Sequence, residues 1–150
     1  MYNLREGKGT FKGLIGECMF KLTRKNLILT RFFGKNKFFK IFSTKISYLE
    51  REFLYKNWFS IDAIEFDYSQ KPRKIVLFEI KTQNYYRNRK FNWKPKMTLA
   101  THNIYKEALR LEFDVKMVII ELYDAWDYDA KIKDFNESDY YIDKPKRYDK

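Results

Sequence analysis

The sequence predicts a mixed α/β fold, in which a central mixed sheet is flanked by helices. A helical apolar pattern comes first, followed by several short apolar or aromatic runs, a second helical pattern and a further apolar run. The chain has 150 residues, of which 45% are hydrophobic and 19% aromatic, so it can bury a real core. We expect one domain over residues 1–130 and a polar C-terminal tail over 131–150.

In the first half, apolar residues recur at helical spacing over residues 11–22 and predict a helix. Two β-branched or aromatic runs, 27–33 and 38–42, are split by Gly34-Lys35-Asn36-Lys37 and predict a hairpin. Residues 45–56 fit either a short helix or an extension of the sheet.

In the second half, residues 58–67 and 73–82 read as strands joined by a turn. Residues 98–113 follow a helical pattern. Residues 115–123 contain an apolar run typical of an interior strand. The predicted order is therefore helix, several strands, helix, strand.

The formal charge of +11 is unevenly distributed. The first 110 residues hold 24 basic and 9 acidic side chains, whereas residues 111–150 hold 7 basic and 11 acidic ones. A dense positive surplus attracts phosphate polymers and favours a nucleic-acid partner. It also makes each of the nine acidic residues informative, because this part of the chain has few carboxylates that serve only to keep the surface soluble.

Other composition features exclude several classes of protein. A single cysteine, Cys18, excludes an internal disulfide framework and a cysteine-based zinc cage, and we expect it to be a buried thiol on the first helix. No apolar run approaches the roughly 20 residues of a membrane span. The polar N-terminus lacks the apolar core of a signal peptide, so we expect a cytoplasmic, intracellular protein with no membrane partner.

Three acids stand at informative places. Glu17 lies on the first predicted helix, Asp62 lies within an apolar strand, and Glu79 follows the apolar run 75–78. The strand period of two puts Glu79 and Lys81 on one face. If the two strands pair as a hairpin, Asp62 lies beside Glu79 on that face.

This set of side chains suggests phosphodiester chemistry. Carboxylates in an apolar strand are costly unless a cation or hydrogen-bond donors compensate them. Two such groups suit Mg²⁺ or Mn²⁺, which can polarise a phosphodiester and lower the pKa of a water. Lys81 could orient that water or stabilise the developing charge.

The whole arrangement resembles the PD-(D/E)XK nuclease superfamily, and within it the archaeal Holliday-junction resolvases. The matching residues are Gly13 and Glu17 in a G-x-x-x-E helix, Asp62 on one strand, and Glu79-Ile80-Lys81 on the next. The resemblance covers about residues 10–123 as element order and implies a restriction-endonuclease-like core. It implies that Asp62, Glu79 and the main-chain carbonyl of Ile80 bind the metal.

The resemblance also implies that Lys81 assists the attacking water and that Glu17 helps to organise the metal or its waters. The sequence departs from the family pattern at Ile61, where the family has proline. The spacing between Asp62 and Glu79 is long, so Glu65 or Asp67 remain alternatives for the first acid.

A basic, aromatic segment over residues 83–97 directly follows Lys81 and is expected to rim the site. Its cations can grip the nucleic-acid backbone while its rings stack on bases. Lysines of the predicted hairpin are expected to form an opposite wall. The expected nucleic-acid-binding residues are Lys35, Lys37, Gln83, Arg87, Arg89, Lys90, Lys94 and Lys96.

We therefore expect a divalent-metal-dependent endo- or exodeoxyribonuclease, with branched intermediates of recombination, repair or replication as candidate substrates. A homodimer is implied by the resemblance alone. The first alternative is a basic nucleic-acid-binding protein without catalysis. The second is a metal-free RNA endonuclease resting on His102, a tyrosine and a lysine.

Overall fold

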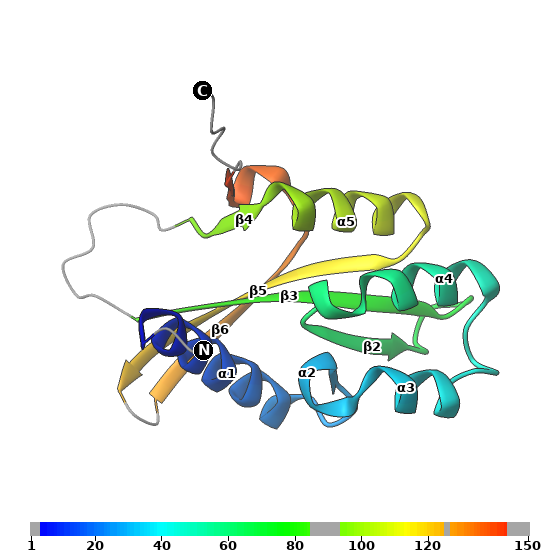
Figure 1. The fold of residues 1–150 in the computed structure, drawn as a ribbon, viewed down its shortest axis with the longest axis horizontal. Helices are drawn as coiled ribbons and strands as arrows, with labels where there is room; N and C mark the ends of the chain where they lie inside the picture. Colours follow the sequence, from blue (N-terminus) through cyan, green and yellow to red (C-terminus); the bar gives the residue numbers. More distant parts are fainter. Residues whose placement is uncertain (1–3, 85–93, 125–126, 144–150) are drawn as a thin grey trace.

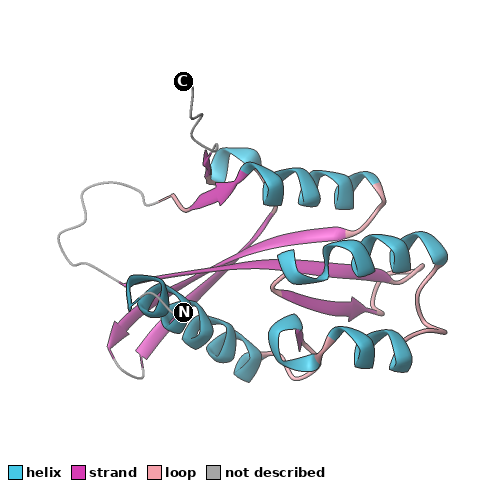
Figure 2. Cartoon of the chain, viewed as in Figure 1, coloured by secondary structure: helices cyan, strands magenta, loops and turns pink. Residues whose placement is uncertain are grey.

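The computed structural model describes residues 4–84, 94–124 and 127–143, which form an α+β fold around a five-stranded mixed sheet (Figure 1). The sheet has the order β1-β2-β3-β5-β6, and helices cover it (Figure 2). Strands β3 and β5 are parallel, and the other pairs are antiparallel. The predicted mixed sheet flanked by helices is confirmed. Its strands are β1 (Ile28–Leu29), β2 (Ala63–Asp67), β3 (Lys74–Asn84), β5 (Asp114–Asp124) and β6 (Asp127–Asp134).

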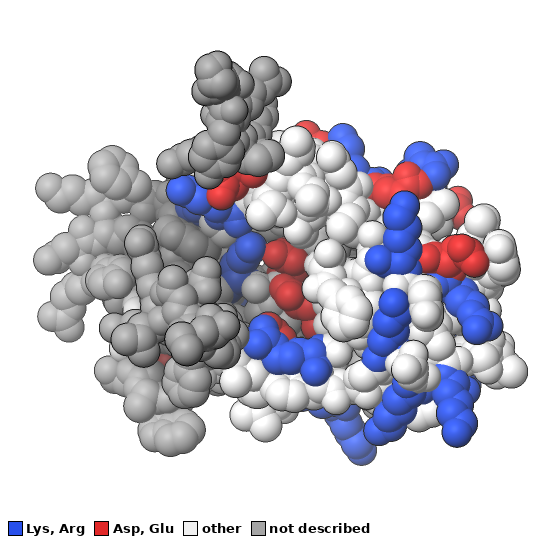
Figure 3. Space-filling view, in the orientation of Figure 1, with Lys and Arg blue, Asp and Glu red and all other residues white. Residues whose placement is uncertain are grey.

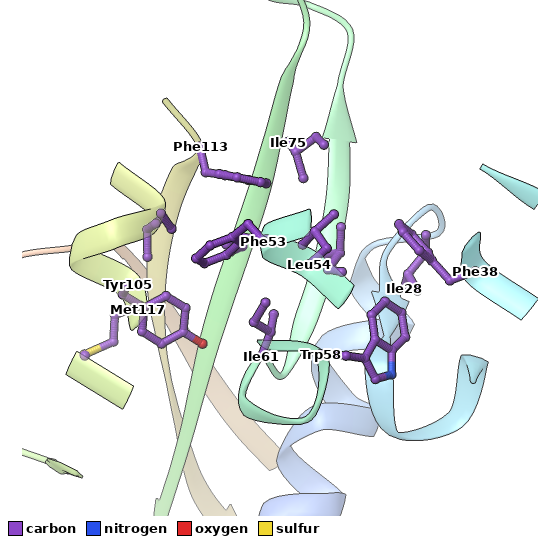
Figure 4. Packing of buried hydrophobic residues seen from close by; sticks show 14 of the residues in the cluster. Ile28, Phe38, Phe53, Leu54, Trp58, Ile61, Ile75, Tyr105, Phe113 and Met117 are labelled. Carbon is purple, nitrogen blue, oxygen red and sulfur yellow. The ribbon is translucent and has the colours of Figure 1, made fainter. Parts of the chain in front are cut away.

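Alternating residues of β3 divide the core into two layers, one on each face of the sheet. Val76 and Phe78 pack in the layer that contains Met19 and Phe20 of α1 (Leu4–Thr23). Side chains of α3 (Lys35–Ile41), α4 (Tyr48–Asn57) and α5 (Leu99–Arg110) fill the larger layer on the opposite face (Figure 4). Some residues of this larger layer are Ile75, Leu77, Phe38, Phe53, Leu54 and Tyr105.

The first helix is longer than the apolar pattern predicts, and its buried face is different. Met19 and Phe20 are buried, whereas Cys18 is exposed and Leu22 is 83% exposed. The expectation of a buried Cys18 thiol is therefore wrong. The buried face of α1 also carries Gly16 and Glu17, which the hydrophobic pattern does not mark.

The hairpin predicted over 27–42 is also wrong. After the two residues of β1 the chain turns into α2 (Thr30–Phe33) and α3 (Lys35–Ile41), with Gly34 between them at a φ of 92°. Phenylalanines repeat at helical spacing, and Phe33, Phe38 and Phe42 contact one another. This aromatic packing outweighs the strand propensity of the individual residues.

The ambiguous segment 45–56 forms helix α4 (Tyr48–Asn57). A capping box begins it, since Ser47 and Glu50 each accept a hydrogen bond from the other's backbone N–H. A 3₁₀ turn, η1 (Trp58–Ser60), follows, so the strand predicted over 58–67 starts later, at Ala63. Asp62 thus lies one residue before β2.

The second half of the chain forms a helix and a strand where the sequence predicts them, α5 (Leu99–Arg110) and β5. The polar tail predicted over 131–150 is not separate from the domain, because β6 crosses residue 130 and pairs with β5 along its length. Beyond β6 the short turn η2 (Glu137–Asp139) and β7 (Tyr141–Asp143) follow, and β7 pairs with β4 (Lys96–Thr98). Tyr140, between η2 and β7, is buried and forms a hydrogen bond with His102 of α5.

Among the described residues, no helix combines the length and the apolar character needed to cross a membrane.

Candidate active site

Asp62 and Glu79 come together at the start of β2. The antiparallel register pairs Ala63 with Phe78, so extending it by one residue places Asp62 opposite Glu79. Opposite residues project from the same face with Cβ atoms about 5 Å apart. The Asp62 carboxylate also accepts a hydrogen bond of 2.8 Å from the backbone N–H of Ile80, next to Glu79. The predicted juxtaposition of these two residues is confirmed.

A hydrogen bond and an ion pair fix the Glu79 carboxylate, which is only 6% exposed. Its Oε1 accepts a hydrogen bond of 2.8 Å from the hydroxyl of Tyr105, a buried residue of α5 that Figure 4 shows among the core side chains. Its Oε2 lies 3.1 Å from Nζ of Lys81. Each oxygen of Glu79 therefore has its own partner, one neutral and one cationic.

The third acid, Glu17, reaches this region from α1. It is 4% exposed and forms an ion pair with Arg31 of α2, at 2.8 Å between Oε2 and the guanidinium. Glycine at position 16 lets α1 approach β3, since a Cβ there would overlap the hydroxyl of Thr82 and lie 3.0 Å from its Cβ. In contrast, a Cβ on Gly13, the glycine of the G-x-x-x-E pattern, would touch nothing within 4 Å.

Helix α2 anchors the main chain at Asp62. The backbone N–H of Thr30 donates to the Asp62 carbonyl at 3.2 Å, and the Thr30 hydroxyl donates to the carbonyls of Ile61 and Asp62. The next residue, Arg31, is the partner of Glu17. One turn of α2 thus fixes the positions of two of the three acids.

The pKa values of Asp62 and Glu17 are both raised. Burial raises the pKa of Asp62 well above its usual range, and the charges of Glu79 and Glu17 add to this effect, while the N–H of Ile80 opposes it. Burial also raises the pKa of Glu17, although Arg31 works in the opposite direction. Figure 3 shows acidic side chains gathered in the middle of one face, between basic ones. A cation bound beside Asp62 and Glu17 would offset the unfavourable free energy of their buried negative charge.

The two alternative first acids lie elsewhere. Glu65 forms an ion pair with Arg24 at 2.5 Å and lines a pocket of about 450 Å³ with Val76 and Phe78, on the opposite face of the sheet. Asp67 stands at the far end of β2 and accepts hydrogen bonds from Ser69 and Gln70. The structure therefore brings Asp62, and neither alternative, next to Glu79.

The donor set fits a hard divalent ion with an open coordination sphere. Within residues 13–84, 94–123 and 127–143, no three Asp, Glu, His or Cys side chains are grouped so that they could hold a metal by themselves. Two carboxylates are nevertheless enough for Mg²⁺, which commonly takes its other ligands from water and substrate phosphates. Asp62, Glu79 and the main-chain carbonyl of Ile80 remain the predicted ligands.

The predicted nucleic-acid-binding residues divide into three groups. Lys35 and Lys37 lie on helix α3 instead of a hairpin strand. Gln83 is a buried residue of β3, on the same face as Lys81, whereas Lys96 is exposed on β4 and Lys94 lies just before that strand. Arg87, Arg89 and Lys90 lie outside the described residues.

Sequence reasoning missed the roles of Arg31 and Tyr105. Tyr105 is on the apolar face of a predicted helix, and a buried tyrosine hydroxyl needs a hydrogen-bond partner, so an acid on the facing strand was a possible inference. Arg31 gave no comparable signal, because its partner is on another helix. His102, on which the metal-free alternative rests, is buried and forms a 2.6 Å hydrogen bond with Tyr140.

Comparison of the chain with protein-family models, with curated proteins and with solved structures finds no match.

Proposed function

We propose that the protein is a divalent-metal-dependent deoxyribonuclease with a restriction-endonuclease-like core, related to the PD-(D/E)XK nucleases. The observation that carries the proposal is the opposition of Asp62 and Glu79, with Lys81 paired to Glu79 from the same face of β3. Two carboxylates and a lysine in this arrangement supply metal ligands and a cation near the reacting phosphate.

The order of the elements supports this proposal. Helix α1 is followed by the antiparallel strands β1, β2 and β3, then by α5 and by β5, which runs parallel to β3. The same order of helix, strands, helix and strand is what the resemblance implies. Helices α2, α3 and α4 form an insertion between β1 and β2 and leave this order intact.

Each residue has a role that follows from its contacts. Asp62, Glu79 and the Ile80 carbonyl would hold the ion, which would polarise the phosphodiester and lower the pKa of a water. Tyr105 keeps Glu79 in one orientation through its hydrogen bond. Lys81, which pairs with Glu79, would place a positive charge near the phosphate as it gains negative charge. Glu17, held by Arg31, would orient water beside the pair.

A cleavage assay tests the proposal. Wild-type protein is incubated with labelled duplex, single-stranded and branched DNA in the presence of Mg²⁺, Mn²⁺ or EDTA. We expect cleavage of at least one DNA with either metal and none with EDTA. Glu79→Gln and Lys81→Met are expected to lower the rate by at least about 100-fold while DNA binding persists.

Two outcomes would contradict the proposal. DNA binding without metal-dependent cleavage of any substrate would favour the non-catalytic binding protein. Cleavage that continues in EDTA would favour a metal-free nuclease.

A further inference from the structure

The insertion between β1 and β2 presents an exposed aromatic side chain next to the candidate active site. Phe59, in η1, is 87% exposed, although its neighbour Trp58 is fully buried against Phe38 and Phe39. The buried Trp58 anchors this turn, so Phe59 projects from a rigid base. A single exposed phenylalanine needs no partner on its own, but three neighbouring features point to one.

The first such feature is the short path from Phe59 to Asp62. Two residues separate them, and because the three Cα–Cα steps are each about 3.8 Å long, their Cα atoms lie within about 11 Å of each other. The turn between them is closed by a hydrogen bond from the N–H of Ile61 to the carbonyl of Trp58. Phe59 is therefore placed at the edge of the proposed catalytic pair.

The second feature is a lysine held among aromatic rings. The ammonium of Lys35 lies 3.6 Å from the ring centroid of Tyr55 and 5.5 Å from that of Phe59. Tyr55 is half exposed and is itself packed on Phe39 of α3. An exposed ring beside a positioned cation is the combination that grips one nucleotide, because the base stacks on the ring while the phosphate meets the cation.

The third feature is the charge of the insertion as a whole. Residues 30–60 hold seven basic and two acidic side chains. Figure 3 shows basic side chains over α3 and α4 on the same face as the acidic cluster. This charge favours a polyanion over an apolar protein surface as the partner of Phe59.

From these features we propose that Phe59 and Lys35 bind an unpaired nucleotide beside the scissile phosphate, so that the substrate is DNA with a single-stranded or splayed segment. Bases in an intact duplex are stacked on one another and cannot lie flat on a protein ring, whereas an unpaired base can. This inference rests on the proposed nuclease for the position of the scissile phosphate. The binding of the unpaired base itself needs no metal.

The test measures binding in EDTA, where no cleavage is expected. Fluorescence anisotropy follows a labelled oligo(dT) single strand of about 16 nucleotides and a duplex of the same length. We expect Phe59→Ala to weaken single-strand binding by about 5- to 100-fold and duplex binding by less than about twofold. Phe59→Trp should retain single-strand binding, and Phe59→Leu should lose it, because leucine is apolar but has no flat π-face.

Tyr68→Ala serves as the matched control. Tyr68 is also an exposed aromatic residue, 60% accessible, but it follows the far end of β2. Tyr68 follows Asp62 by six residues, which corresponds to about 20 Å along an extended strand. Its loss should therefore leave single-strand binding unchanged. A 2-aminopurine in the single strand adds a spectroscopic signature, since its fluorescence is quenched on stacking and should recover with Phe59→Ala.

Several results would overturn the inference. Unchanged single-strand binding by Phe59→Ala would show that the ring serves another partner, such as a protein. Equal losses for single strand and duplex, or full binding by Phe59→Leu, would exclude stacking. If the wild type binds through Phe59 but never cleaves with metal, the nuclease proposal fails and the binding of the unpaired base stands, so the two failures are distinguishable.

Discussion

Asp62 and Glu79 face each other across the start of β2, where Glu79 is buried and Asp62 is half-buried. Burial and the nearby charge of Glu79 raise the pKa of Asp62, so its ionised form is unfavourable as the protein stands. Lys81 supplies one positive charge, at Oε2 of Glu79. A proton on Asp62 or a divalent ion between the two residues would offset the remaining repulsion, and these two solutions compete.

This competition predicts how stability depends on pH. Because the pKa of Asp62 is higher in the folded than in the unfolded protein, stability is retained below the ordinary value of 3.8 and is lost as the pH rises through the folded pKa. We expect Asp62→Asn to have a higher Tm than the wild type at neutral pH and an equal Tm below that ordinary value. The asparagine oxygen can still accept from the N–H of Ile80.

Metal addition completes this experiment. Millimolar Mn²⁺ should raise the Tm of the wild type at neutral pH but not that of Asp62→Asn, because a ligand stabilises the state that binds it. A wild type that is more stable than the variant in the absence of metal would contradict the electrostatic part of the account.

The hydroxyl of Tyr105 provides a second prediction at this scale. Tyr105→Phe leaves Oε1 of Glu79 without its buried donor, so we expect unfolding free energy to fall by about 1–3 kcal/mol. Cleavage should fall by about 10- to 100-fold, because the carboxylate loses its fixed orientation. Tyr140→Phe is the matched control, since it removes a hydroxyl that contacts His102. Equal cleavage by Tyr105→Phe and the wild type would remove Tyr105 from the site.

The elements differ in how well local sequence predicts them. Strands β3 and β5 and helix α5 are long, strongly patterned segments, and they form where they are expected. The sequence of helices α2 and α3 predicts a hairpin instead, because a short run of β-branched and aromatic residues fits a strand as well as a helix. Long-range packing stabilises the helical form, because Phe38 contacts Trp58 and Phe66. No local sequence pattern contains that information.

The approach of α1 to β3 gives a prediction with a built-in control. A methyl group at Gly16 would overlap Thr82, so we expect Gly16→Ala to lower the unfolding free energy by about 1–3 kcal/mol. Gly13→Ala meets no atom and should raise it by up to about 1 kcal/mol, because alanine favours the helix. Urea denaturation measures both values.

The combination of Gly16→Ala with Thr82→Ala should recover part of the loss, since it removes the overlapping hydroxyl. If Gly16→Ala and Gly13→Ala have equal unfolding free energies, the close approach of α1 to β3 is contradicted, and so is the placement of Glu17.

The start of α4 depends on Glu50, which caps the helix and pairs with Arg73. Burial acts to raise the pKa of Glu50, but hydrogen bonds from Arg73 and Ser47 outweigh it and lower the pKa. Its contribution is therefore present above the ordinary value of 4.5 and is lost as the pH falls through the folded pKa. Glu50→Ala should cost about 1–2 kcal/mol at neutral pH and less in acid, as thermal denaturation can show.

Glu52→Ala, at an exposed position of the same helix, should change stability by less than about 0.5 kcal/mol. A loss of equal size for both variants, or one that does not shrink in acid, would argue against the capping and ion-pair role of Glu50.

At the scale of the whole molecule, the acidic site lies within the most basic part of the chain. The first 110 residues carry a balance of +15, and the three acids of the site lie within that basic part. The meeting of Asp62 with Glu79 could be predicted, because strand period and a hairpin are enough to place them on one face. The partners Arg31 and Tyr105 could not be predicted with certainty, because they reach the site from helices whose packing is set by distant contacts.

The central claim is that Asp62 and Glu79 together hold the ion that cleaves DNA, and single-turnover cleavage tests it most directly. Complexes of labelled DNA with the wild type, Asp62→Asn or Glu65→Gln are formed in EDTA, and excess Mn²⁺ starts the reaction. We predict equal DNA binding by all three, similar rates for the wild type and Glu65→Gln, and a rate at least about 100-fold lower for Asp62→Asn. Cleavage by Asp62→Asn at the wild-type rate would contradict the account.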